Sequence, residues 1–337
     1  MINYNFEENF EIAYCLTPFH FLQFFLLHKM GIKSYIITNN SIEMSLLFEK
    51  FRDFIFIPID ERKIFYQKLK KYLLLKNFKV SIDYYYSTPW NLTALKLESI
   101  IQKCKNGKVH LLEDGLGNYI ENYQINPQKN FRDYILKMYF KINGLDYCVS
   151  HFEKYKLSIK KNINLNFYSI LPNKYFGSCK ANLITKENLK YLNELKTHYK
   201  NLLKENKIKS VFFDTNDAEH GWIDIETKIN ILKNIFTEET LYLPHPFQKF
   251  KLSKYIENLI EVENLKLKFN ELLVYFLEPE KVYSVFSTSL ITLKYLFNMN
   301  AEYVLLADIF YKKTKNKKYL IGAEELKKLI YGEYETL

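Results

Sequence analysis

Glycine is scarce in this chain, which has nine glycines in 337 residues beside 28 tyrosines and 27 phenylalanines. Each remaining glycine is therefore expected where the backbone needs it. Neither a GxGxxG fingerprint nor a Walker loop occurs, so the common phosphate-binding signatures are lacking. Hydrophobic residues make up 48% and charged residues 26% of the sequence. These shares are ordinary for a globular protein and argue against disorder or a fibrous role.

Long apolar runs are lacking as well. The most apolar run, residues 16–27, is shorter than the roughly 20 residues that span a bilayer, and polar residues and a proline interrupt it. The first ten residues, MINYNFEENF, carry acids where a secretion signal needs lysines and then an apolar core. We therefore expect a cytoplasmic protein, either free or held on the cytoplasmic face of the inner membrane.

Cysteine and metal-binding patterns are sparse. No CxxC, no HExxH and no Cys/His cluster occurs. The motif Asp224-Ile225-Glu226 has a DxD spacing, but we expect it to begin a helix, where acids are favourable. No metal site is expected. The four cysteines are widely spaced, three of them in apolar runs, and are expected to be small buried hydrophobes: Cys15, Cys104, Cys148 and Cys179.

Positive charge is in excess, with 48 Lys and Arg against 38 Asp and Glu, a net charge of +10. Such a surplus attracts nucleic acid, anionic lipid or an acidic substrate. No RNP, KH, helix-turn-helix or zinc pattern is present, so a nucleic-acid partner is not expected. Lysines and arginines stand beside Tyr, Phe and Leu near 62–80 and 128–160. That pattern suits either an acidic membrane surface or an ordinary solvated helix face.

Short β-branched or aromatic runs alternate with longer helical patterns along the chain, which is typical of parallel sheets covered by helices. In the first half we predict strands at 11–16, 33–38, 54–59, 79–86, 108–113 and 146–150, and helices near 18–30, 41–52, 62–76, 89–104 and 128–142. In the second half we predict strands at 208–214, 240–243, 259–262, 282–286 and 303–306, and helices near 186–206, 223–236, 269–277, 288–297 and 324–331.

This alternation predicts an α/β protein with two doubly wound, Rossmann-like domains facing a cleft. We expect the domains at 1–165 and 166–337. The segment 151–185 lacks clear helical periodicity and is the candidate linker. Ligands of such folds bind beyond the carboxyl ends of the strands, so the residues that follow each strand are the candidate site residues.

Two strand ends in the first half carry polar groups. After the first strand, Thr17 and Pro18 suit a helix start whose N–H groups bind an oxygen, although an ordinary cap is an equal alternative. His20, one turn into the same helix, either faces the cleft or is packed in the protein interior. After the fifth strand, Glu113 and Asp114 form a carboxylate pair in which mutual repulsion can raise one pKa toward that of a general base. Gly115 permits the tight turn that follows.

Three strand ends in the second half carry candidates. His245 lies between Pro244 and Pro246, which fix its backbone for donation to a phosphate or a leaving group. A run of three hydroxyl residues, Ser287-Thr288-Ser289, precedes a helical pattern and suits an anion. The short polar run Asp214-Thr215-Asn216 closes another strand.

In this order the motifs resemble those of bacterial sialyltransferases, and most closely glycosyltransferase family 52, the lipooligosaccharide sialyltransferases. The resemblance covers residues from about 11 to 298. It rests on Cys15-Leu16-Thr17-Pro18 with Gln23, on Glu113-Asp114-Gly115 running into Gly117-Asn118, on His245-Pro246 and on Ser287-Thr288.

The resemblance implies a GT-B fold and inverting transfer of sialic acid from CMP-sialic acid to a terminal sugar hydroxyl, expected to be galactose of a lipooligosaccharide or capsular glycan. No metal or other cofactor is implied. Asp114 would be the general base, with Glu113 tuning or sharing its work. The other implied contacts are His245 with Pro246, Ser287, Thr288 and Ser289 at the CMP phosphate, Glu271 at the ribose with Glu261 or Glu263 as competitors, Thr215 and Asn216 in the donor loop, and Thr17, His20 and Gly115 at the acceptor.

On this reading the segment 1–165 is the acceptor-side domain with the base, and 166–337 binds the CMP-sugar donor. A homodimer is a further option. One alternative is a polysialyltransferase or another CMP-sugar-dependent capsule transferase with the same motifs. Another is an inactive GT-B domain that serves assembly, which would require the loss of Asp114 or His245, and both are present.

Overall fold

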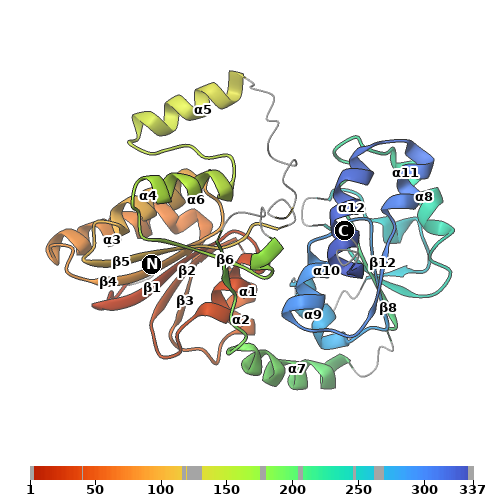
Figure 1. Cartoon of the computed structure of the whole chain (residues 1–337). Coiled ribbons are helices and arrows are strands. Elements are labelled where there is room, and N and C mark those ends of the chain that lie inside the picture. Colours follow the sequence, from red (N-terminus) through yellow and green to blue (C-terminus); the bar gives the residue numbers. More distant parts are fainter. Residues whose placement is uncertain are drawn as a thin grey trace. The chain divides into compact units, whose positions relative to one another are not determined.

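The computed structural model describes residues 4–39, 41–115, 119, 131–174, 180–203, 208–245, 248–261 and 269–332. Backbone contacts divide the chain into two compact units, Met1–Asn188 and Leu189–Leu337. We call these units the first and the second domain. Each contains one sheet, and every strand pair in the described ranges is parallel (Figure 1).

The sheet of the first domain has the strand order β3-β2-β1-β4-β5-β6-β7. The chain runs outward from β1 to β3 and then returns to β4 on the other side of β1. The switch point of the sheet therefore lies between β1 and β4, where doubly wound folds bind ligands. The strands are β1 (Asn9–Cys15), β2 (Ser34–Thr38), β3 (Phe54–Pro58), β4 (Ser81–Tyr86), β5 (Asn106–Leu111), β6 (Leu165–Ser169) and β7 (Asn182–Leu183).

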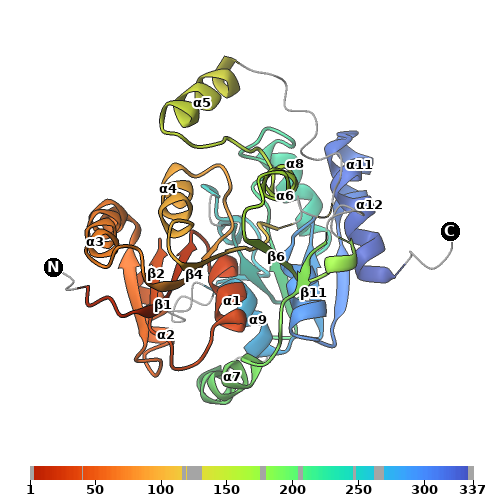
Figure 2. The same cartoon turned by 60° about the vertical axis from the view of Figure 1, so that its left-hand side comes forward.

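Helices cover both faces of this sheet. Its first two helices lie on one face, and α3, α4 and α6 lie on the other (Figures 1 and 2). The helix α5 lies outside that second layer, farther from the strands. The buried core between sheet and helices is rich in aromatic side chains from β1, β4 and α3. The helices are α1 (Pro18–Leu27), α2 (Ser41–Leu47), α3 (Arg62–Leu75), α4 (Leu92–Ile101), α5 (Phe131–Ile142) and α6 (His151–Lys160).

The second domain repeats the scheme with five strands in the order β10-β9-β8-β11-β12, so its switch point lies between β8 and β11. Its core joins the strands to α8, α11 and α12. The strands are β8 (Ser210–Phe213), β9 (Thr240–Leu243), β10 (Leu259–Ile260), β11 (Lys281–Ser284) and β12 (Glu302–Leu305). The helices are α7 (Leu189–Leu203), α8 (Ile225–Lys233), α9 (Asn270–Leu277), α10 (Ser289–Ile291), α11 (Ala307–Thr314) and α12 (Lys318–Tyr331).

The predicted pair of doubly wound α/β domains is confirmed, and ten of the eleven predicted strands correspond to strands of the structure. The exception is 146–150, which is not a strand. Ser150 instead caps α6, its hydroxyl accepting a hydrogen bond from the Glu153 N–H at 3.2 Å. The sixth strand of the sheet is β6.

The segment 151–185 is not a linker, because it contributes α6, β6 and β7 to the first domain. The division between the domains therefore falls after Asn188, later than the expected 165/166 boundary. The reason lies in α6, whose buried residues are His151, Lys154 and Ser158. A helix that buries polar side chains shows no apolar periodicity.

Two helical regions of the second domain also differ from the prediction. The stretch predicted as one helix over 288–297 is the short α10 followed by a π-helix over Thr292–Leu296. The helix α11 was not predicted, and α12 begins at Lys318 rather than at 324.

Three cysteines, Cys15, Cys104 and Cys148, are buried free thiols, as predicted. Cys179 lies outside the described residues. Among the helices that the structure describes, none combines the length and the apolar character that crossing a membrane requires.

Candidate active site residues in the two domains

The sheet of the first domain brings three polar strand ends to one edge. Its register pairs Tyr14 of β1 with Tyr86 of β4, and Tyr86 with Leu111 of β5. The polar residues just beyond these strands are Thr17, then Ser87 and Thr88, then Glu113 and Asp114. Because the carboxyl ends of parallel strands meet at one edge, these groups gather at the switch point of the sheet.

Thr17 begins α1 as predicted. Its hydroxyl accepts a hydrogen bond from the His20 N–H at 3.3 Å, and Pro18 occupies the first turn. This start places the buried His20 ring against the end of β5, with Nε2 2.9 Å from Asp114 Oδ1. An ionised carboxylate only accepts, so the His20 Nε2–H donates. The Asp114 side chain keeps 27% of its surface exposed, which leaves room for a ligand.

Glu113 is fully buried and held on two sides. The Gln23 side chain donates to the Glu113 carbonyl at 2.8 Å and accepts from its N–H at 3.0 Å. The carboxylate accepts from the Tyr119 hydroxyl at 2.6 Å and from the Ile170 N–H at 2.9 Å. The contacts with Gln23 hold the backbone next to Asp114, and those with Tyr119 and Ile170 hold the Glu113 side chain.

Burial raises the pKa of Glu113 to about 7, against the opposing effect of the hydrogen bonds from Tyr119, Ser169 and Ile170. The carboxylate pair therefore does contain a member with a raised pKa. The expected cause, repulsion between neighbouring carboxylates, is wrong, because removal from water is the cause. Gly115 has φ +120°, which meets the expectation of a glycine-specific turn. Gly117 and Asn118 lie outside the described residues.

Sequence reasoning missed three groups at this edge. Burial lowers the pKa of His151 to about 4, and the charge of the nearby Asp114 opposes this shift. The ring of His151 lies 6.0 Å from that of Trp90. The hydroxyls of Ser87 and Thr88 are buried and have no hydrogen-bond partner within the described ranges. Their position directly after a predicted strand was the signal that could have identified them.

In the second domain the carboxyl ends of β8, β9 and β11 are adjacent, because Phe213 pairs with Leu243 and with Ser284. The predicted candidates follow these strands and therefore share one edge of the sheet. They are Asp214, Thr215 and Asn216 after β8, His245 after β9, and Ser287, Thr288 and Ser289 after β11.

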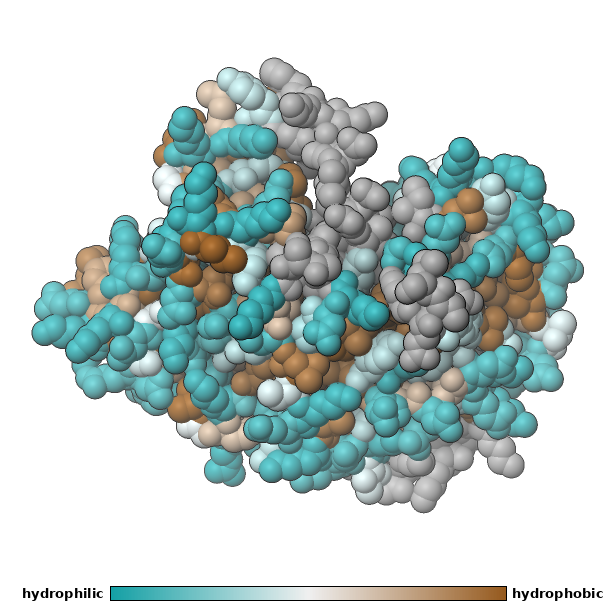
Figure 3. Space-filling model, viewed as in Figure 1, coloured by the Kyte–Doolittle hydropathy of each residue, from teal (hydrophilic) through white to brown (hydrophobic). Residues whose placement is uncertain are grey.

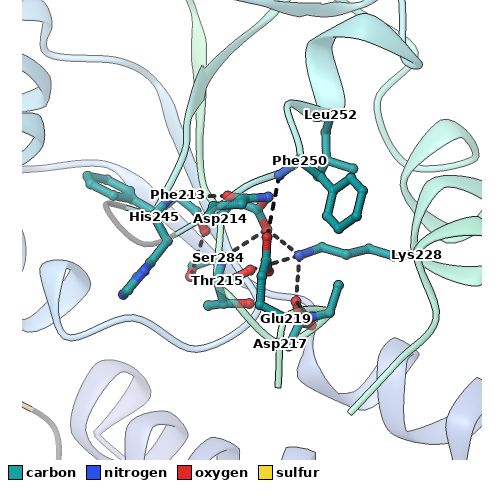
Figure 4. A network of polar contacts seen from close by, with 12 residues as sticks. Phe213, Asp214, Thr215, Asp217, Glu219, Lys228, His245, Phe250, Leu252 and Ser284 are labelled. Carbon is teal, nitrogen blue, oxygen red and sulfur yellow. Dashed lines mark hydrogen bonds and ion pairs between the residues drawn. The ribbon is translucent and has the colours of Figure 1, made fainter. Parts of the chain in front are cut away.

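Asp214 belongs to a buried ion network (Figure 4). Lys228, on α8, lies 2.7 Å from Asp214 Oδ1 and 2.5 Å from Asp217 Oδ1, and all three side chains are inaccessible to water. Its ammonium also donates to the Thr215 carbonyl at 2.8 Å. Burial alone would lower the pKa of Lys228, but the two carboxylates outweigh it and raise that pKa. The Asp214 carboxylate is therefore held inside this network.

The same network holds the segment that carries His245. The Gln248 amide donates to Asp214 Oδ2 at 2.5 Å, and its Oε1 accepts from the His245 N–H at 3.1 Å. The Tyr242 hydroxyl donates to the same Asp214 oxygen at 2.9 Å. Burial lowers the pKa of His245, which favours the neutral form of its imidazole. Pro246 lies outside the described residues.

Three more candidates meet at the start of α10. The Ser289 hydroxyl donates to Glu271 Oε1 at 2.9 Å, and the Ser287 hydroxyl accepts from the Ser289 N–H at 3.2 Å. Burial raises the pKa of Glu271. Its competitor Glu261 instead pairs with Lys251 at 2.7 Å and with Ser253. Glu263 lies outside the described residues.

Thr288 and Thr215 complete the set. Thr288 has helical backbone angles directly before α10 and makes no capping hydrogen bond. The Thr215 hydroxyl is buried without a partner in the part of the chain that the structure describes, and Asn216 is half-buried. Asp224 caps α8 by accepting from the Thr227 N–H at 2.7 Å, so the DxD spacing does mark a helix start. In the described ranges no group of three or more His, Cys, Asp or Glu side chains could hold a metal ion.

The two doubly wound parallel domains are those of a GT-B-type α/β protein, as expected. Among solved structures, the chain is similar to the crystal structure of an α/β-galactoside α-2,3-sialyltransferase from the luminous marine bacterium Photobacterium phosphoreum. The TM-score is 0.61 and the sequence identity is 13%, over 95% of this chain and 96% of the other. Compared by sequence, the chain matches no protein family and no curated protein.

Proposed function

We propose that this protein is a glycosyltransferase that moves sialic acid from CMP-sialic acid to a sugar hydroxyl. The observation that carries the proposal is the Asp114–His20 pair, in which a partly exposed carboxylate at the switch point is held at 2.9 Å by a buried imidazole. The fold shared with a bacterial sialyltransferase supports the choice of reaction. Membership in glycosyltransferase family 52 is a hypothesis that rests on the sequence motifs.

In the proposed mechanism Asp114 acts as the general base. As the acceptor oxygen forms its bond to the anomeric carbon of sialic acid, the proton of the acceptor hydroxyl passes to the Asp114 carboxylate. His20 keeps that carboxylate in place, and Thr17 and Gly115 fix the backbone on either side of the acceptor position. Glu113, with its buried side chain and raised pKa, supports Asp114 and is not the group that contacts the acceptor.

The second domain supplies the groups for the leaving phosphate. As the bond from the anomeric carbon to the phosphate oxygen breaks, its electron pair stays with CMP. His245, Ser287 and Thr288 donate hydrogen bonds to the negative charge that develops there. A bound phosphate favours the protonated imidazole, which opposes the effect of burial on His245. Ser289 and its partner Glu271 bind the ribose, and Thr215 and Asn216 bind the donor next to the phosphate.

Inverting stereochemistry and independence of metal are part of the proposal. The base and the phosphate donors then suffice for the reaction. A terminal galactose of a bacterial surface glycan is the proposed acceptor, and the cytoplasm the proposed compartment.

The test is titration calorimetry of the purified protein with CMP, with and without EDTA, and with UMP, GDP and ADP as controls. We expect saturable binding of CMP alone that EDTA does not change. His245→Ala should weaken CMP binding by about tenfold, because a charge-assisted hydrogen bond is lost. The matched control is Lys281→Ala, an exposed residue of the same domain at the end of β11 opposite to the candidate residues, which should bind CMP as the wild type does.

A preference for UMP or GDP would overturn sialyl transfer while leaving the fold untouched. The absence of binding to all four nucleotides would overturn the enzymatic role. If CMP binds, incubation with CMP-sialic acid and a galactoside separates the two acceptor modes. A single added sugar indicates a sialyltransferase, and a ladder of products indicates a polysialyltransferase.

A further inference from the structure

The helix α5 carries a continuous exposed apolar face. Its members are between 47% and 79% exposed, and they are Tyr134, Ile135, Met138, Tyr139 and Ile142. Their spacing of one and four residues places them within an arc of roughly 140° around a helix with 3.6 residues per turn. We call this set the α5 apolar face. Scattered single apolar residues on a surface need no explanation, but five on one side of a twelve-residue helix do.

The opposite side of α5 is the one that attaches it to the first domain. Phe140 is buried in the core of that domain, with its ring 5.2 Å from that of Tyr147. Leu136, one turn before Phe140, is half-buried. The helix lies outside the α4 and α6 layer in both views of the fold (Figures 1 and 2). The apolar face therefore points away from the core to which α5 is attached.

Lysines border this face. Lys137 and Lys141 are both exposed, and they lie one turn apart along the edge marked by Tyr134 and Met138. Figure 3 shows hydrophobic and hydrophilic side chains next to one another over α5. An amphipathic helix with aromatic and aliphatic residues on one side and lysines beside them is the pattern of helices that lie in the interface of a membrane.

We propose that the α5 apolar face docks the first domain onto a membrane surface that carries anionic lipids. The five apolar side chains would enter the boundary between headgroups and acyl chains, and the lysines would contact lipid phosphates. The net charge of +10 adds long-range attraction to the same surface. Charge argues against a second copy as the occupant, because two α5 faces would bring lysines of like sign to one interface.

The proposal does not depend on the reaction, since it concerns a helix that contains none of the candidate site residues. If both proposals hold, the enzyme is placed at the surface where a lipid-linked sugar acceptor is found. Transfer to a soluble galactoside would then be unchanged by loss of the α5 apolar face.

The experiment is co-sedimentation of the full chain with vesicles, one set containing phosphatidylglycerol and phosphatidylcholine and the other phosphatidylcholine alone. We expect binding to the anionic set only, and a large decrease in about 0.5 M salt. Ile135→Glu/Ile142→Glu should lower the partition coefficient by about tenfold or more, and Lys137→Gln/Lys141→Gln by about tenfold. The matched control is Ile42→Glu/Leu46→Glu, two exposed residues one turn apart on α2, which should bind as the wild type does.

Wild-type protein that stays in the supernatant would overturn the proposal, as would equal binding by the α5 variant. Analytical ultracentrifugation distinguishes the other occupant. A wild-type dimer that becomes monomeric in Ile135→Glu/Ile142→Glu, without binding to vesicles, would make the face a contact between copies instead. Circular dichroism of each variant verifies that it is folded.

Discussion

The two domains use carboxylates at the same edge of similar sheets in opposite ways. In the first domain Asp114 is partly exposed and lies 2.9 Å from the His20 imidazole. In the second domain Asp214 and Asp217 are inaccessible to water and share the ammonium of Lys228. One arrangement leaves a carboxylate that can accept a proton, and the other fixes the loops after β8 and β9. A carboxylate after a central strand can thus stay open to a ligand or become part of the internal packing, depending on whether a cation is buried with it.

The strongest test of this comparison removes the exposed carboxylate. Asp114→Ala should lower the transfer rate by about 10²- to 10⁴-fold, the usual contribution of a general base, and leave CMP affinity unchanged. Initial rates with CMP-sialic acid and a galactoside, together with CMP titration, measure both effects. Near-normal turnover would show that Asp114 is not the base and would make Glu113 the next candidate.

Removal of the buried cation should instead cost stability. Lys228→Met leaves two buried carboxylates without their counter-ion, and we expect a loss of about 3–5 kcal/mol in the free energy of unfolding. Urea titration followed by circular dichroism measures it. The control in the same domain is Lys281→Met, which breaks an exposed ion pair with Glu302 and should cost less than about 1 kcal/mol. Equal losses in both variants would contradict a structural role for the network.

The protonation of Glu113 should give the first domain its own pH dependence. Its folded pKa of about 7 lies above the ordinary 4.5, so the folded chain holds a proton that the unfolded chain releases between these values. The stability that this proton provides is complete below pH 4.5 and is lost as the pH rises through 7. Glu113→Gln should therefore remove a decrease of roughly 3 kcal/mol between pH 4.5 and 7.

Urea titrations of the wild type and of Glu113→Gln across that interval provide the measurement. Two parallel stability curves would mean that Glu113 ionises in the folded protein as it does in water.

The smallest expected effect is on stability, and it comes from the loss of either of two helix N-caps. Thr17→Ala and Asp224→Ala each remove an N-cap and should each cost about 1 kcal/mol of stability. Only the first should also lower the transfer rate, because Thr17 begins the helix that carries His20 to Asp114. Thermal unfolding and initial rates of both variants test this. Equal transfer rates in Thr17→Ala and Asp224→Ala would show that the α1 cap does not contribute to the reaction.

Most of the fold could be predicted from local pattern. The strands of both sheets are short β-branched or aromatic runs, and the rule that ligands bind at carboxyl ends directed attention to Thr17, Asp114 and His245. The segment 151–185 could not be predicted, because α6 buries polar side chains and therefore has no apolar stripe.

Contacts between residues far apart in the sequence could not be predicted from local sequence patterns either. Nothing near Gln23 indicates that its side chain pairs with Glu113, 90 positions later. Likewise nothing in the sequence distinguishes Lys228 from an ordinary helix lysine, because its partner Asp214 follows β8, a different element. The buried ion pair of Asp214 could not be predicted for this reason, since its partner Lys228 comes from another element.

Asn188, the last residue of the first domain, returns to the first helix of that domain. Its side-chain amide donates at 2.8 Å both to the Phe25 carbonyl and to the His28 carbonyl, near the end of α1. The helix α1 is synthesised early, because it lies near the N-terminus. The amide that binds carbonyls near its end is translated 160 positions after His28. Until then its phenylalanines depend on a sheet that is still incomplete. The emerging chain thus has to be kept from aggregating throughout the synthesis of its first domain.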